Sequence, residues 1–210
     1  MRPFTLLSWE RLYAIYRAVK YLTSAGIEGD VVECGVWRGG SSMLMASTFV
    51  AAGDASRRLF LYDTFAGMTR PTDADRDASG EAAMKRWTAE QQEGFNTWCY
   101  APIEEVRRNV LSTGYPEALI ELVKGDVEQT IPARTPGRIA LLMLDTDWYA
   151  STRHELQHLF PLLVSRGVLI IDDYGHWSGA KKAVDEYFRE SGVSLLLNRI
   201  DYSGLAGVKP

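Results

Sequence analysis

The chain has 210 residues, of which 46% are hydrophobic and 24% are charged, and its formal net charge is −4. This length fits a single domain, and the apolar fraction is large enough to bury a core, which excludes a globally disordered chain. The chain lacks the excess of basic residues with which proteins bind a phosphate backbone, so nucleic acid is not an expected partner. Cys34 and Cys99 lie far apart and form neither a disulfide framework nor a zinc ribbon, which favours a reducing, cytoplasmic setting.

The apolar segments of the chain are short. Charged residues interrupt the stretch Met1–Leu22, so we expect no signal peptide. The longest apolar runs are Ile139–Leu144 and Val168–Ile171, a third or less of the roughly 20 residues that a membrane-spanning helix needs. We therefore expect no membrane association and interpret both runs as buried strands.

The chain alternates predicted helices and strands. An amphipathic helix is expected over Ser8–Ala25, where apolar residues recur every three or four positions and the first serine can cap the first turn. Helices are also expected after the glycine pair Gly39-Gly40 and after the last two strands, to Leu163 and to about Glu190. The predicted strands are Val31–Gly35, Leu59–Asp63, Leu119–Lys124, Ile139–Asp145 and Gly167–Asp173. This order predicts an α/β fold with a doubly wound, parallel sheet.

Two segments depart from this alternation. Leu195–Leu197 and Leu205–Lys209 are separated by too few residues for a crossover helix, so we expect an antiparallel hairpin at one edge of the sheet. Between Thr64 and Trp98 the chain is polar and rich in aspartate, with aromatic residues near the end of the segment. We interpret residues 64–98 as a mobile flap, or lid, inserted in a single domain.

Acidic residues stand at or just after the ends of the predicted parallel strands. Any one of them could simply end a strand, but the ligands of open parallel sheets bind beyond the carboxyl ends of the strands. Carboxylates gathered at one edge repel one another, which raises their pKa values unless cations or hydroxyl donors are bound among them. The pattern therefore predicts a ligand site at this edge. The residues concerned are Glu33, Asp63, Asp126, Asp145, Asp172 and Asp173.

A glycine-rich loop, Gly35–Ser42, follows the first strand, and its spacing matches neither the dinucleotide-binding G-x-G-x-x-G pattern nor the P-loop. The negative charge of Glu33 would oppose a pyrophosphate but suits a sulfonium group, and Asp63 stands where a carboxylate accepts bonds from ribose hydroxyls. S-adenosylmethionine, a nucleoside joined to a cationic amino acid, is therefore the predicted cofactor. Trp37 and Arg38 either clamp it or only cover it. The predicted cofactor-binding residues are Glu33, Gly35, Trp37, Arg38, Gly40, Ser41, Ser42, Asp63, Asp126 and Asp145.

A second group of carboxylates predicts a metal site. Asp145, Asp172 and Asp173 present hard oxygen ligands from two strand ends, which suits Mg²⁺ rather than zinc or copper. Three carboxylates leave open positions that a vicinal diol can fill, and coordination acidifies a hydroxyl. Asp147, two residues beyond Asp145 and past the strand, is the predicted general base. A small-molecule glycoside or polyol is thus the expected substrate.

Several runs of the sequence resemble the macrocin O-methyltransferase family, which methylates sugar hydroxyls on antibiotics. The matching runs are Gly29–Ser41, Leu61–Met68, Leu144–Tyr149, Ile171–Trp177, Gly179–Phe188 and Val208-Lys209. The resemblance covers nearly the whole chain and implies a Mg²⁺-dependent enzyme of the class I methyltransferase fold, with a seven-stranded sheet. It implies metal binding by Asp145, Asp172 and Asp173 and a general-base role for Asp147. The chain begins a few residues before its first predicted helix, so we expect a longer N-terminal arm to be absent, and assembly into a homo-oligomer is left open.

Two other functions fit part of the pattern. In a metal-dependent glycosyltransferase, Asp145-Thr146-Asp147 would hold Mn²⁺ and a sugar nucleotide, but Glu33 and the pair Asp172-Asp173 would stay unexplained. A phosphoacceptor receiver domain, which is a regulatory module, carries its acidic pair on the first strand, whereas here the pair ends the fifth. Methyl transfer accounts for more of these residues than either alternative.

Two short motifs imitate metal sites. The run His154–His158 matches the zinc-peptidase pattern H-E-x-x-H, but the apolar stripe of its helix predicts that both histidines face solvent, where there is no pocket. Asp73, Asp75 and Asp77 imitate the start of an EF-hand loop, but the position of the loop's glycine holds another residue. We interpret these aspartates as part of a solvated flap.

Overall fold

Seven strands form the central sheet of the structure, a computed structural model that describes residues 2–210. Their order across the sheet is β5-β2-β1-β6-β7-β9-β8. The parallel strands are β1 (Asp30–Cys34), β2 (Leu59–Asp63), β5 (Ile120–Lys124), β6 (Ile139–Leu144) and β7 (Leu163–Ile171), and the antiparallel ones are β9 (Leu205–Val208) and β8 (Asn198–Arg199). The predicted α/β class, with a mostly parallel sheet and an antiparallel pair at one edge, is confirmed.

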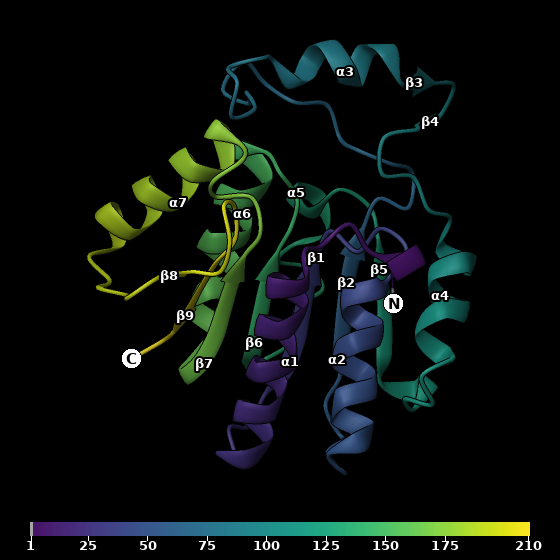
Figure 1. The fold of residues 1–210 in the computed structure, drawn as a ribbon, viewed down its shortest axis with the longest axis vertical. Coiled ribbons are helices and arrows are strands. Elements are labelled where there is room, and N and C mark those ends of the chain that lie inside the picture. Colours follow the sequence, from purple (N-terminus) through teal and green to yellow (C-terminus); the bar gives the residue numbers. More distant parts are fainter. Residues whose placement is uncertain (1) are drawn as a thin grey trace.

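Helices cover both faces of this sheet (Figure 1). One face carries α1 (Trp9–Ser24), α2 (Gly40–Ala51) and α4 (Ile103–Leu111), and the other carries α5 (Val127–Thr130), α6 (Tyr149–Leu159) and α7 (Ser178–Ser191). Single turns of 3₁₀ helix lie at Arg2–Phe4, Glu117–Leu119 and Phe160–Leu162. No helix within residues 2–210 combines the length and the apolar character that crossing a bilayer requires.

The strands are apolar on both faces because each face packs against a layer of helices. All six residues of β6 are buried. Neighbouring residues of β1 join different clusters, since Val31 faces the layer of α1 and α2 and Val32 faces the layer of α6 and α7. Strands of this kind have continuous apolar runs instead of alternation. This two-sided core fixes the strand register and, with it, the row of residues at the carboxyl ends.

Two predicted boundaries around β7 are wrong. The helix predicted to reach Leu163 ends at Leu159, because Pro161 lies in the 3₁₀ turn that follows and cannot continue an α-helix. β7 therefore begins at Leu163, earlier than the predicted Gly167, and it contains Arg166 in the left-handed region at φ 66°.

The C-terminal hairpin is shifted along the chain relative to its prediction. Leu195–Leu197 lies outside the sheet, and the residues that pair with β9 are Asn198 and Arg199. Leu195 and Leu197 instead pack beside the core, whereas Leu196 is exposed, and an apolar run does not distinguish such packing from strand pairing. The helix α4 has no counterpart among the predicted elements, because only Val106 and Val110 of its nine residues are buried.

Residues 64–98 arch over the carboxyl ends of the strands, at the top of Figure 1. This insertion contains α3 (Ala83–Ala89) and a ribbon of two short strands, β3 (Gln91–Gln92) and β4 (Phe95–Asn96). Its position places it over the edge where the sequence predicts a ligand. Its movement as a lid stays a prediction.

Two polar contacts tie the insertion to α6. The indole Nε1 of Trp148 donates to the carbonyl of Thr69 at 3.0 Å. The carboxylate of Asp75 accepts the amide of Tyr149, the first residue of α6, at 2.8 Å, and also the amide and hydroxyl of Thr72. Asp75 is fully buried, so the interpretation of this residue as part of a solvated flap is wrong.

Asp75→Ala removes the acceptor of these amides, and we expect it to lower the free energy of unfolding by about 1–3 kcal/mol, because buried donors then lack partners. Asp75→Asn keeps one oxygen and should lose less. Denaturant unfolding measures the loss, and amide hydrogen exchange within residues 64–98 should accelerate in the alanine variant. Unchanged stability and exchange in both variants would show that Asp75 does not anchor the insertion.

Candidate active site

The hydrogen-bond ladder of the parallel strands continues past their ends. The backbone amides of Gly35, Asp145 and Asp172 donate to carbonyls of the neighbouring strands at 2.8–2.9 Å. Asp63 is itself the last residue of β2. These four residues therefore stand in a row at one edge of the sheet, as the strand-end pattern predicts.

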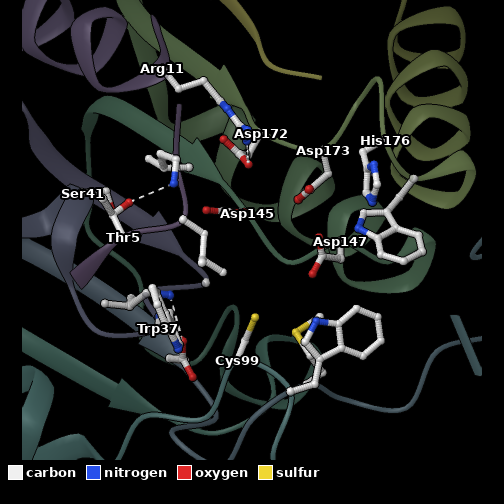
Figure 2. Close-up of a pocket in the computed structure, with 18 of the residues that line it drawn as sticks. Thr5, Arg11, Trp37, Ser41, Cys99, Asp145, Asp147, Asp172, Asp173 and His176 are labelled. Carbon is white, nitrogen blue, oxygen red and sulfur yellow. Dashed lines mark hydrogen bonds and ion pairs between the residues drawn. The ribbon is translucent and has the colours of Figure 1, made fainter. Parts of the chain in front are cut away.

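A cavity of about 300 Å³ opens at this edge (Figure 2). Asp63 and Asp145 line it from the strand ends. The other walls come from the N-terminal segment Phe4–Leu7, from Arg11 on α1 and from Trp98 in the insertion. Segments that are far apart in the sequence thus enclose a single space.

A smaller cavity of about 60 Å³ lies beside the first one. Asp63 and Asp145 line both cavities, and the smaller one extends to Asp126 and Val127 after β5. Asp126 also caps α5, because its side chain accepts the amide of Glu128 at 2.9 Å.

Two glycines of the loop between β1 and α2 are required by close contacts. Gly35 has a φ of 83°, and a Cβ there would lie 1.8 Å from the carbonyl oxygen of Asp145. A Cβ at Gly40 would lie 2.5 Å from the carbonyl oxygen of Phe4 and 2.6 Å from the Cβ of Thr5. Any larger residue would therefore push the loop away from β6 or from the N-terminal segment.

Glu33 lies beneath this loop and has no exposed surface. The hydroxyls of Ser41 and Ser42, in the first turn of α2, both donate to its carboxylate. Burial raises the pKa of Glu33 to about 7, and the two hydroxyls offset part of that shift. Ser41 lines the larger cavity, whereas Glu33 and Ser42 lie behind it.

The carboxylate of Asp63 is engaged by the backbone of the same loop. Its Oδ2 accepts the amides of Val36 and Trp37 at 2.8 and 2.9 Å, and its Oδ1 accepts the amide of Phe65 at 2.7 Å. Asp63 thereby shapes the loop. Oδ1 also lies 3.5 Å from the hydroxyl of Thr64. Binding of ribose hydroxyls by Asp63 stays a prediction.

Trp37 and Arg38, which are neighbours in the loop, point in different directions relative to the cavities. Trp37 lines the larger cavity. Arg38 turns away from both cavities and donates to Glu105 on α4 and to the carbonyl of Pro3, each at 2.6 Å. Arg38 therefore fastens the loop to α4 and to the N-terminal segment in this structure, and its contact with a cofactor stays a prediction.

An acidic cluster faces the larger cavity. One carboxylate oxygen from each of Asp145, Asp147 and Asp173 lies within 4.8 Å of the others. Asp172 forms an ion pair with Arg11 of α1 instead, and Figure 2 shows Arg11 reaching it at the edge of the cavity. The structure thus groups two of the three predicted metal ligands, Asp145 and Asp173, with the predicted base Asp147, and places Asp172 beside them.

Burial dominates the electrostatics of this cluster. It raises the pKa values of Asp145 and Asp173 well above their usual range and that of Asp147 to about 7, and neighbouring carboxylates raise them further. Burial also raises the pKa of Asp172 to about 6, although Arg11 opposes this shift. Asp172 Oδ1 and Asp173 Oδ2 are buried without a hydrogen-bond partner. Such oxygens call for a cation, and a set of carboxylates fits a hard divalent ion such as Mg²⁺.

Asp147 has an uncommon backbone conformation. Its φ of 67° lies in the left-handed region, which side chains disfavour. Its carboxyl group lies beside that of Asp173, and the side chain of Trp177 is a further neighbour. Trp177 in turn packs edge-on against Trp148, with ring centroids 5.0 Å apart. Asp147 is therefore held between the acidic cluster and a group of tryptophans.

The pattern H-E-x-x-H does not bring its three side chains together. His154 Nε2 contacts the carbonyl oxygen of Ile131 at 2.9 Å, and both histidines are half-buried, so the prediction that they face solvent is wrong. Glu155, between them, turns into the core and accepts the hydroxyl of Thr146 at 2.9 Å. The two histidine rings pack against each other, with centroids 4.4 Å apart, whereas Glu155 has separate partners.

The family model described as Macrocin-O-methyltransferase (TylF) matches residues 2–207. The chain belongs to this family. The predicted family and enzyme class, an O-methyltransferase, are confirmed.

Similar proteins share most of the chain. It is 33% identical over 201 residues to the 8-demethyl-8-(2,3-dimethoxy-alpha-L-rhamnosyl)-tetracenomycin-C 4'-O-methyltransferase of Streptomyces olivaceus, covering 96% of this chain and 74% of that protein. It is 30% identical to the demethyldecarbamoylnovobiocin O-methyltransferase of Streptomyces niveus, with the same coverage. The solved structure of the O-methyltransferase NovP superposes with a TM-score of 0.83 at 30% identity, covering 98% of this chain and 82% of that one.

In this family member, several cavity residues come from outside the strand ends, and the sequence analysis missed them. Arg11 lies on the polar side of α1, and the local sequence gives no indication that it pairs with the buried Asp172. Leu6 is 68% exposed and yet lines the cavity. Trp98 gave a partial signal as an aromatic residue in a polar insertion. Cys99 lies beside it and lines the cavity as well.

The raised pKa of Glu33 makes the stability of the ligand-free protein depend on pH. Between its usual value of 4.5 and its folded value of about 7, the folded chain keeps a proton that the unfolded chain releases. This contribution is complete below the lower value and is lost as pH rises through the upper one. We expect the free energy of unfolding, measured with denaturant from about pH 5 to about pH 8, to fall less steeply in Glu33→Gln than in the wild type. Identical slopes would contradict the assignment.

Proposed function

We propose that this protein transfers a methyl group from S-adenosylmethionine to a hydroxyl of a sugar moiety on a natural product, with Mg²⁺ held at the acidic cluster. The observation that carries the proposal is that one cavity joins the loop Gly35–Ser42 to Asp145, Asp147 and Asp173. A methyl donor at the loop and a hydroxyl at the cluster would then meet in one enclosed space. Family membership supports the reaction, and the rhamnosyl group in the name of one relative supports a sugar acceptor.

The donor side of the cavity suits a cationic nucleoside derivative. Asp63 lines the cavity and Glu33 lies behind the loop, and a bound sulfonium or ammonium group would favour the charged forms of both carboxyl groups. The smaller cavity, with Met68, Asp126 and Val127 in its wall, would take the nucleoside base. Gly35 allows the donor loop to lie directly against the end of β6, next to the acceptor side.

The acceptor side suits a metal-bound hydroxyl. Asp145 and Asp173 would hold the ion, together with Asp172, whose buried Oδ1 has no hydrogen-bond partner. When bound, Mg²⁺ lowers the pKa of a coordinated hydroxyl. Asp147, which lines the same cavity beside Asp145 and Asp173, would then take the proton of the acceptor hydroxyl as general base.

The transfer is then a single displacement. The acceptor hydroxyl gives its proton to Asp147, and the acceptor oxygen forms a bond to the methyl carbon. The carbon–sulfur bond breaks at the same time and leaves its electron pair on sulfur, so the donor departs as a neutral thioether. The insertion and the segment Phe4–Leu7 enclose this space, and we propose that closure of residues 64–98 excludes water during transfer. Glycosyl transfer, the alternative prediction, would use the same acidic turn, but the family membership favours methyl transfer.

Purified protein with Mg²⁺ should transfer label from methyl-labelled S-adenosylmethionine to members of a glycoside panel. Excess chelator should abolish turnover and leave cofactor binding nearly intact, because Glu33 and Asp63 lie apart from the metal ligands. Isothermal titration with the cofactor, and with sugar nucleotides as the control, measures binding. A protein that neither binds the cofactor nor labels any acceptor would refute the function, and full turnover in chelator would refute the metal requirement.

Two variants distinguish the general base from the metal ligand within the acidic turn Asp145-Thr146-Asp147. Asp147→Asn keeps the shape of the side chain but loses the basic oxygen, so kcat should fall about 10²- to 10⁴-fold with little change in KM or in Mg²⁺ affinity. Asp145→Asn should instead weaken Mg²⁺ binding and recover part of its rate at higher metal concentration. If added metal restored the rate of Asp147→Asn and not that of Asp145→Asn, Asp147 would be the metal ligand and Asp145 the base.

A further inference from the structure

The helix α6 carries a buried carboxyl group, Glu155, that the proposed reaction does not use. Its side chain has no exposed surface, and its Oε1 accepts the hydroxyl of Thr146 at 2.9 Å. Its Oε2 is buried and receives no hydrogen bond from a nitrogen or oxygen donor. The thiol of Cys34, at the end of β1, lies against the same carboxyl group.

Stability alone does not account for a carboxyl group at this place. Burying an incompletely bonded carboxyl costs free energy, and an apolar side chain of similar size would fill the space without that cost. Burial also raises the pKa of Glu155 to about 8, so the group is mostly a neutral acid near pH 7. A neutral acid still accepts a hydroxyl, which is the contact that the structure shows.

The contact reaches a constrained turn of the candidate active site. Thr146 stands between Asp145 and Asp147, both of which line the larger cavity, whereas Thr146 lines the smaller one. Asp147 adopts a left-handed conformation, and the amide of Trp148 donates to the carbonyl of Thr146 at 2.8 Å. Conformations of this kind persist only where surrounding contacts hold them.

We propose that Glu155 is a positioning residue that fixes the turn Asp145-Thr146-Asp147 through the hydroxyl of Thr146. The inference rests on the proposed function, because the turn carries the metal ligand and the base of that reaction. Glu155 also lies against Cys34, the residue before Gly35, so one side chain contacts both the acidic turn and the end of the strand that leads into the donor loop. The carboxyl group of Asp145 then stays directed toward the metal, and that of Asp147 toward the proton of the acceptor hydroxyl.

Paired variants test this role. Thr146→Val keeps the shape of the side chain and removes the hydroxyl, and Glu155→Leu removes its acceptor. Each should lower kcat about ten- to a hundredfold, since displacement of a reacting group by about 1 Å can cost about a hundredfold. The KM of the cofactor should change little in Glu155→Leu, because Glu155 lines neither cavity, whereas Thr146 lines the smaller one. The double variant should be no slower than the slower single variant, because both remove one contact. Thr146→Ser and Glu155→Gln, which keep the hydrogen bond, should retain most of the rate.

Gln157→Leu, an exposed change on the same helix, is the matched control. Thermal unfolding verifies that each variant folds, and calorimetry with Mg²⁺ should show weaker binding in Thr146→Val and Glu155→Leu than in Thr146→Ser. Wild-type rates and metal affinity in Thr146→Val and Glu155→Leu would overturn the inference, as would losses that add up in the double variant. If the wild type itself does not bind S-adenosylmethionine, the proposed function is overturned and this inference with it. If the wild type is active and the variants equal it, only this inference is overturned.

Discussion

The whole site depends on the continuation of the parallel ladder past the ends of β1, β6 and β7. The amides of Gly35, Asp145 and Asp172 still pair with the neighbouring strand, so these residues inherit the register that the core imposes. A slip of one residue would exchange the two faces of a strand and replace Asp145 with Leu144 or Thr146 at the edge. The close contact of Gly35 with the carbonyl of Asp145 then joins the donor loop to the acidic turn. Core packing thereby sets the distance between the two halves of the reaction.

This register concentrates carboxyl groups, and the chain compensates each of them differently. Glu33 receives two serine hydroxyls, Asp63 receives three backbone amides, and Asp172 receives the guanidinium of Arg11. Asp147 and Asp173 lie beside each other, and neither carboxyl group forms an ion pair in the described part of the chain. Carboxyl groups that are buried to a similar extent therefore differ in how far their negative charge is compensated. The compensation is least for Asp147 and Asp173, where the cavity opens. That is the place where an incoming cation stabilises the protein most.

Features set by the two-sided core were predictable from sequence, whereas features set by distant partners were not. The strand Leu59–Asp63 and the row of acidic strand ends follow from apolar runs and a simple rule of parallel sheets. Asp75 has the same local context as Asp73 and Asp77, and only the docking of the insertion gives it the amide of Tyr149. The pairing of Arg11 with Asp172 likewise joins residues whose sequence positions carry no sign of each other. The prediction of secondary structure near Pro161 was wrong for a local reason. A 3₁₀ turn ends the helix before its predicted end, and the next strand begins before its predicted start.

The acidic turn is held from two sides, and this links the insertion to the chemistry. Below the turn, Glu155 bonds the hydroxyl of Thr146. Above it, Asp75 bonds the amide of Tyr149, two residues after Asp147, and so fixes the start of α6. The insertion can approach this closely only because the second residue of α7 is a glycine: a Cβ at Gly179 would lie 1.9 Å from the carboxylate of Asp75. The insertion supplies no carboxyl to the cluster, yet its docking fixes the helix start that directs Asp147. Any motion that lifts Asp75 from α6 would therefore change the position of Asp147, the proposed base, as well as the access of solvent.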